Sequence, residues 1–167
     1  MALTFVTCGS CAAQNCADYA MGVGVFVDVK NSGITYAYAK QNLAEKKKKE
    51  NMSGAAYKQY YKLLSEAYEE IPANVSAVNA SISRFNVCKG QTPASSSDIC
   101  FGLAGIAGVA ATERDKGRSM DSQRSEFRNK DIQWGEVMLK KAYDQKNTAP
   151  WDLQQQQYFN CKKNMKL

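Results

Sequence analysis

The chain has 167 residues, of which 44% are hydrophobic and 23% charged, a composition typical of a globular protein with a substantial core. It contains no histidine, which excludes Ser-His-Asp and Cys-His catalytic sites and leaves only cysteines to form a zinc site. The net charge of +6 is spread over both halves, whereas nucleic-acid-binding proteins usually concentrate their positive charge. We therefore expect no cofactor, no metal and no nucleic-acid partner.

Residues 1–15 form an uncharged, mildly apolar segment that is similar to the end of a signal peptide, although it lacks a basic start. Its Cys8 and Cys11 are spaced as Cys-Gly-Ser-Cys, which makes them a candidate redox pair or a local disulfide. The sequence lacks the βαβ pattern that accompanies such redox pairs, and this favours a local disulfide or thiols left from processing. No apolar run approaches the roughly 20 residues of a membrane span.

The sequence contains an internal repeat, which predicts its architecture. Residues 100–127 align without a gap with residues 16–43, and two shorter matches follow in the same order. We therefore expect an all-α fold made of two tandem copies of a small unit with about four helices each. The predicted organisation is an N-terminal segment at 1–15, repeat 1 at 16–88, a linker at 89–99, repeat 2 at 100–161 and a basic tail at 162–167.

The first helix of each copy is predicted by comparing the two copies. Alone, the stretch GVGVFVDV at 22–29 would indicate a strand, because it is rich in β-branched residues. Its counterpart at 102–116 is rich in alanine and ends before Gly117, which is typical of a helix. The glycines inside both stretches lower helix propensity, so they indicate close approach between helices. Gly33 and Gly117 are expected to end these helices in the left-handed conformation.

The second and third helices of copy 1 carry the candidate binding surface. A lysine run flanked by glutamates ends the second helix, and an apolar stripe with helical spacing, rich in tyrosine, marks the third. Charge runs of this kind are usually solvated, and tyrosines on such a stripe are more often core and rim residues than a binding face. The candidate residues are Lys46, Lys47, Lys48, Lys49, Tyr57, Tyr60 and Tyr61.

Four cysteines bracket the two copies. Duplicated units are expected to repeat their own bond, which favours the pairs Cys16–Cys88 and Cys100–Cys161. The alternative joins Cys88 to Cys100 across the linker and Cys16 to Cys161 across the ends. Either set indicates an oxidising compartment, so we expect a periplasmic or secreted protein.

Several short motifs resemble a group of small secreted bacterial helical proteins with disulfides, most of them uncharacterised. They are RDKGRS at 114–119, Ala142-Tyr143-Asp144, a helix start at Pro150, and an aromatic-rich end with Cys161. In that group a helix that begins with cysteine ends in an Arg-Asp-x-Gly-like turn. Copy 2 matches this pattern, whereas copy 1 has Lys-Asn-Ser-Gly at 30–33. The resemblance implies a location in the bacterial envelope and supplies no catalytic residue.

The function expected from these features is binding to another protein. The concrete hypothesis is a periplasmic inhibitor or immunity-type protein that covers an envelope enzyme or toxin, because a rigid disulfide-linked surface loses little entropy on binding. One alternative is a structural component of an envelope assembly. Less favoured is an enzyme, either a hydrolase that uses Asp or Glu, or a thiol oxidoreductase that uses Cys8 and Cys11. The sequence leaves the oligomeric state open.

Overall fold

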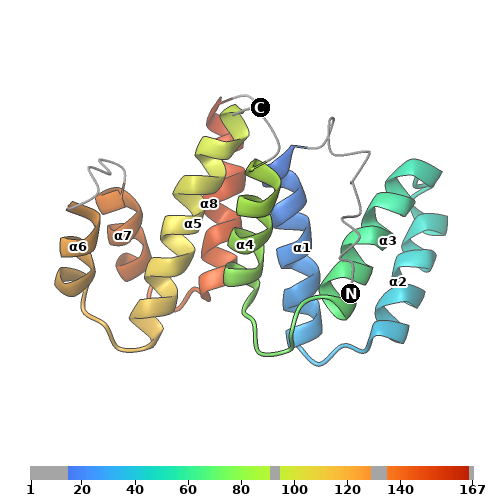
Figure 1. The fold of residues 1–167 in the computed structure, drawn as a ribbon, viewed down its shortest axis with the longest axis horizontal. Coiled ribbons are helices and arrows are strands. Elements are labelled where there is room, and N and C mark those ends of the chain that lie inside the picture. The colour runs from blue at the N-terminus through green and yellow to red at the C-terminus, as the bar shows by residue number, and fades with distance from the viewer. Residues whose placement is uncertain (1–14, 91–94, 129–134, 166–167) are drawn as a thin grey trace, which may run out of the picture.

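The protein is all-α, as the repeat predicted. A computed structural model describes residues 15–90, 95–128 and 135–165, and within them there are eight helices and no strand (Figure 1). In chain order the helices are α1 Cys16–Asn31, α2 Tyr36–Lys49, α3 Gly54–Glu69, α4 Ala77–Lys89, α5 Ser96–Asp115, α6 Met120–Arg128, α7 Gly135–Asp144 and α8 Pro150–Met165. The first turn of α5 therefore lies inside the stretch predicted as a linker, and α8 continues into the predicted basic tail.

The helices form two units of four, α1–α4 and α5–α8, with the same internal order. In each unit the first and last helices pack side by side, and the hairpin between them packs against the first helix. The four helices α1, α4, α5 and α8 contact one another across the boundary between the units. They stand in the middle of Figure 1, with the hairpins α2–α3 and α6–α7 at opposite ends. The molecule is thus a central four-helix group with one hairpin on each side.

Two disulfides close the units, and they are the pairs that the repeat favoured. Cys16 bonds to Cys88, with 5.6 Å between their Cα atoms, and Cys100 bonds to Cys161, with 5.4 Å. Each bond joins the start of a unit's first helix to the end of its last helix. The alternative pairing across the linker is therefore wrong. Cys8 and Cys11 lie outside the described residues.

Close approach explains the glycines of the central helices. A Cβ atom added at Gly24 would fall on the indole ring of Trp151 from α8, and one at Gly22 would lie 2.7 Å from Leu63 Cδ1. At Gly108 it would lie 2.9 Å from the side-chain oxygen of Gln154. The expectation of close packing holds at these three positions. It is wrong at Gly102, where an added Cβ would have no neighbour within 4 Å, and at Gly105 the nearest atom would lie at an ordinary contact distance of 3.8 Å. Gly33 and Gly117 end α1 and α5 with φ values of 85° and 86°, which confirms the predicted left-handed turns.

Equivalent positions of the two copies make equivalent hydrogen bonds. The amine of Lys30 donates to the backbone oxygens of Ala67 and Tyr68 in the last turn of α3 and of Ile71 just beyond it. The guanidinium of Arg114, which aligns with Lys30, donates to the backbone oxygens of Ala142, Gln145 and Thr148 around the end of α7. In each unit a cation at the end of the first helix thus satisfies carbonyl groups left unpaired at a helix C-terminus. The tandem duplication remains a prediction, and these matched contacts support it.

Candidate functional site

The structure separates the predicted surface into three groups. Lys46 and Tyr60 line a cavity between α1 and the α2–α3 hairpin. Lys47, Lys48 and Tyr57 line a shallower hollow at the tip of the hairpin, where the Lys47 amine lies 4.6 Å from the centre of the Tyr57 ring. Lys49 and Tyr61 line neither hollow. The buried face of α3 consists of Leu63, Leu64, Glu66 and Ala67, and the tyrosines lie at its edges.

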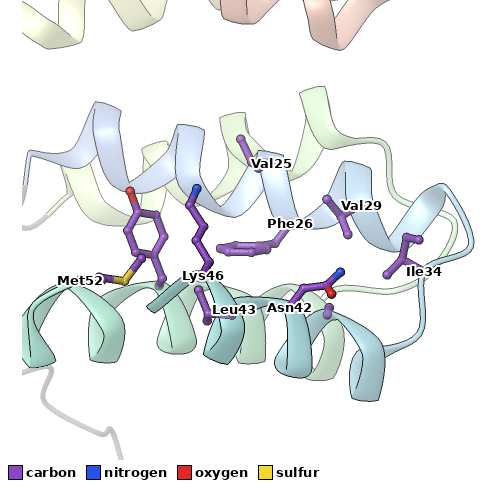
Figure 2. Close-up of a pocket in the computed structure, with 10 residues that line it drawn as sticks. Val25, Phe26, Val29, Ile34, Asn42, Leu43, Lys46 and Met52 are labelled. Atoms are coloured by element: carbon purple, nitrogen blue, oxygen red, sulfur yellow. The ribbon is translucent and has the colours of Figure 1, made fainter. Parts of the chain in front are cut away.

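The cavity has a volume of about 300 Å³ and is mostly aliphatic (Figure 2). Helix α1 contributes Val25, Phe26 and Val29, and Met52 and Ile34 come from the turns that flank α2. In Figure 2 Lys46 rises from α2 beside the Phe26 ring, so its carbon chain covers apolar surface while its amine reaches away from α2. The lining residues are Val25, Phe26, Val29, Ile34, Ala39, Asn42, Leu43, Lys46, Met52 and Tyr60.

Helical spacing explains how α2 contributes its wall. Ala39, Asn42, Leu43 and Lys46 recur at i, i+3, i+4 and i+7, so they share one face of the helix. Ala39 and Leu43 are buried in a small cluster with Leu64 of α3. Phe26 of α1 packs against this cluster, so the cluster joins the α2–α3 hairpin to α1.

A second hollow of about 440 Å³ continues the cavity toward α8. It shares Val25, Phe26 and Tyr60 with the first, and its further lining residues are Asp18, Met21, Gly22, Ala56, Gln59, Leu63, Tyr158 and Phe159. We name the two hollows together the α1 groove. Three large side chains in it remain well exposed, at 38% for Val25, 45% for Tyr60 and 56% for Phe159. The groove therefore presents apolar surface that the described residues leave uncovered.

The two sides of the α1 groove differ in charge. On the α2 side the Lys46 amine lies 3.9 Å from a Glu50 oxygen, but both side chains are more than half exposed, so this pair is weak. At the other end Asp18 accepts a hydrogen bond from the Tyr158 hydroxyl at 2.7 Å and pairs with Lys162 at 2.9 Å. Burial and then the bond to Asp18 raise the pKa of Tyr158. The single carboxylate among the lining residues is thus already engaged.

A buried polar cluster lies behind the groove, where α1, α3 and α4 meet. The carboxylate of Glu66 accepts from the Tyr19 hydroxyl at 2.6 Å and pairs with Arg84 at 2.7 Å. Burial is the main reason why the pKa of Tyr19 is raised, and the bond to Glu66 adds to it. Glu66 is 6% exposed and its partners satisfy it, so this cluster holds the three helices together and offers no reactive group to a substrate.

At the corresponding positions the second unit has charged side chains that pair with one another. Glu113, Arg118 and Glu126 align with Val29, Ile34 and Asn42 of the groove. Arg118 pairs with Glu113 at 3.2 Å and with Glu126 at 2.5 Å. Hydrogen bonds from Lys116 and then Arg118 lower the pKa of Glu113, and the bonds from Glu126 and Glu113 raise that of Arg118.

At another aligned position the second unit again has a polar residue where the first unit has an apolar one. The buried Gln123 of α6 aligns with Ala39 of the groove floor. Its side-chain amide donates to the Ala110 backbone oxygen at 3.2 Å and contacts the Tyr143 hydroxyl at 2.6 Å. The second unit is therefore polar and internally paired at the place where the first unit is apolar and open.

Most of this groove was not predicted from the sequence. Tyr60 and Lys46 were among the predicted residues, but Val25, Phe26 and Phe159 were not. The aligned copies contained a signal, because copy 2 has charged residues at the three positions where copy 1 has the uncharged Val29, Ile34 and Asn42. Only the folded structure shows that these three positions border the same cavity.

Comparison with protein-family models, with curated proteins and with solved structures finds no match to this chain. In the described parts of the chain, no group of three or more Cys, Asp or Glu side chains is placed to hold a metal ion. None of the helices described has the length and apolar character needed to cross a membrane.

Proposed function

We propose that this is an exported protein-binding protein that receives its partner in the α1 groove. The observation that carries the proposal is the contrast between the two units. In the second unit Arg118 pairs with Glu113 of α5 and with Glu126 of α6, whereas the aligned positions of the first unit border a mostly apolar cavity. Large apolar side chains gathered in one exposed groove are typical of interaction sites.

The two disulfides support an exported protein, because such bonds persist in oxidising compartments such as the bacterial periplasm. The resemblance to small secreted bacterial proteins points to the same compartment. The two bonds join α1 to α4 and α5 to α8, and α1 and α8 line the groove. A rigid groove loses little conformational entropy when a partner binds. These properties favour an inhibitor or immunity-type protein that covers an envelope enzyme or toxin.

Site-specific photo-crosslinking tests this function, and the chain provides its own control. A photoreactive amino acid is placed at Val25 in the groove or at Val109, the aligned position of the second unit. Their side chains are 38% and 37% exposed, so nonspecific labelling should be equal. In cells of the source organism, the probe at position 25 should give one discrete protein adduct that position 109 does not give.

Equal labelling at the two positions, or no adduct at position 25, would refute the proposed function. An adduct with twice the mass of the chain would indicate self-association through the groove. That result would favour a structural component of an assembly over an inhibitor.

A further inference from the structure

The length and walls of the α1 groove limit what kind of protein segment fits it. The groove follows α1 from Asp18 to Val29, which corresponds to about 16 Å at the helical rise per residue. Its walls are helices and turns, and the described residues offer no strand edge. An extended segment would therefore leave its backbone N–H and C=O groups facing apolar side chains without partners. A helix satisfies its own backbone and can present about three turns of side chains to the groove.

The exposure of the apolar side chains in the groove distinguishes a helix from a single acyl chain. Ligand sites for small molecules usually cover about 70–90% of the ligand surface. Here Val25, Tyr60 and Phe159 come from three different helices, and each remains more than a third exposed. One hydrocarbon chain would leave much of these side chains in water. A helix about 10 Å across can contact several of them at once.

The charge along the α2 edge indicates the polar chemistry of the partner. Lys46 lines the groove, and Lys47 and Lys48 line the adjoining hollow. The carboxylate at the other end, Asp18, is already engaged by Tyr158 and Lys162. Glu45 and Glu50 flank the four lysines at 46–49, so the net charge along this edge is positive. This charge attracts a segment with acidic residues and repels a basic one.

We propose that the α1 groove binds an amphipathic helix of a partner protein, with its apolar face on Val25, Tyr60 and Phe159 and acidic residues facing Lys46, Lys47 and Lys48. The proposal rests on the proposed function and names the chemistry of the docking segment. Apolar contacts supply most of the affinity, and the lysines select the sign of the charge.

Two synthetic peptides test this proposal with the full chain. Both have about 16 residues and the same leucine stripe at helical spacing, but one carries Glu and the other Lys beside the stripe. Fluorescence anisotropy should show 1:1 binding of the Glu peptide, with a Kd at least about ten-fold lower than that of the Lys peptide. The difference should shrink with added salt, because salt screens exposed charges.

Matched variants locate the peptide and test the charge. Val25→Glu should abolish binding, whereas Val109→Glu, at the equally exposed position, should leave it unchanged. Reversing the three lysines (K46E, K47E and K48E) should make the Lys peptide the tighter ligand. Circular dichroism and the thermal midpoint show whether each variant is folded.

The proposal is overturned if neither peptide binds, if both bind equally, or if Val109→Glu is as damaging as Val25→Glu. Binding of dodecanoate that Val25→Glu removes, in the absence of peptide binding, would identify an acyl-chain site instead. Failure of the peptides together with a discrete crosslink at position 25 would refute only the helix chemistry. Absence of the crosslink would refute the proposed function itself.

Discussion

Gln154 donates a hydrogen bond from its side-chain amide to the hydroxyl of Ser81, 3.1 Å away, across the boundary between the two units. Both side chains are fully buried. Ser81 precedes Cys88 by the same number of residues as Gln154 precedes Cys161, so equivalent positions of the predicted repeat touch each other. Contacts between equivalent positions occur where two units face each other around a two-fold axis. This pair therefore supports an origin of the chain from two copies that packed as a dimer does.

Ser81→Ala should destabilise the protein by about 1–3 kcal/mol, because it leaves the buried amide of Gln154 without an acceptor. The double variant Ser81→Ala with Gln154→Met should lose less than the two single variants together, since it removes both polar partners. Urea denaturation of the four proteins gives the coupling energy. Ser83→Ala on the exposed face of α4 is the control and should change stability little. A coupling energy near zero would show that the contact does not stabilise the interface.

Gly24→Ala should destabilise the protein, because the added Cβ falls on the Trp151 ring and forces α1 and α8 apart. Overpacking of this kind typically costs about 1–3 kcal/mol. Gly102→Ala is the matched control, since this helical glycine has open space where the Cβ would stand. It should stabilise the protein by up to about 1 kcal/mol through helix propensity. Thermal unfolding should therefore move in opposite directions for the two variants.

A compensating variant shows whether the Trp151 contact is the cause. Replacing Trp151 by Leu in the Gly24→Ala background should recover part of the lost stability, although Trp151→Leu alone is destabilising. If the double variant is no more stable than the sum of the single changes predicts, the steric explanation for Gly24 is wrong.

The central helices could be predicted from the sequence because two copies of the pattern constrained each other. The stretch at 22–29 reads as a strand by β-propensity, yet its alanine-rich counterpart at 102–116 indicated the helix that the structure shows. The same comparison selected the bonds Cys16–Cys88 and Cys100–Cys161. Both predictions use only residue types and the order of the aligned segments along the chain, and a single sequence contains this information.

The groove could not be predicted because its residues come together only through packing. Phe159 of α8 lies in the same hollow as Val25 and Tyr60, although no spacing in the sequence links it to them. Helical periodicity also placed Tyr60 and Tyr61 on one apolar stripe, whereas the structure leaves both exposed and buries Leu63 as well as Leu64. The buried face depends on which neighbouring helices cover α3, and periodicity alone does not contain this information.

Alkaline pH should weaken the fold through Tyr19 and Tyr158. Burial is the largest cause that raises the pKa of each phenol, followed by the hydrogen bond to Glu66 or Asp18. The folded pKa values thus lie above the unfolded value of about 10. Stability from these protonated phenols is present in full below pH 10 and declines as the pH rises further, because the unfolded chain loses its protons first.

Urea denaturation at pH 8, 9, 10 and 11 measures this dependence. The free energy of unfolding should fall most steeply above pH 10, and Tyr19→Phe or Tyr158→Phe should each make that fall shallower. Tyr38→Phe is the control, because the Tyr38 side chain is exposed. A slope that neither buried-tyrosine variant changes would assign the alkaline loss of stability to other groups.

Grafting the salt bridges of the second unit onto the first should close the α1 groove. The triple variant Val29→Glu, Ile34→Arg and Asn42→Glu copies the salt-bridged trio of the second unit. In that unit Arg118 pairs with Glu113 and with Glu126. We expect binding of the Glu-flanked peptide to fall at least about ten-fold. Unfolding free energy should change by less than about 1 kcal/mol, since such partly exposed pairs contribute little to stability.

The reciprocal change provides the control for this graft. Arg118→Ala breaks the network in the second unit, and it should leave peptide binding at the first unit unchanged. If the grafted protein is folded by circular dichroism and still binds the peptide as tightly as the wild type, then the open space between α1 and α2 is not where the peptide binds. The difference in polarity between the two units would then concern packing within each unit and would not be related to binding.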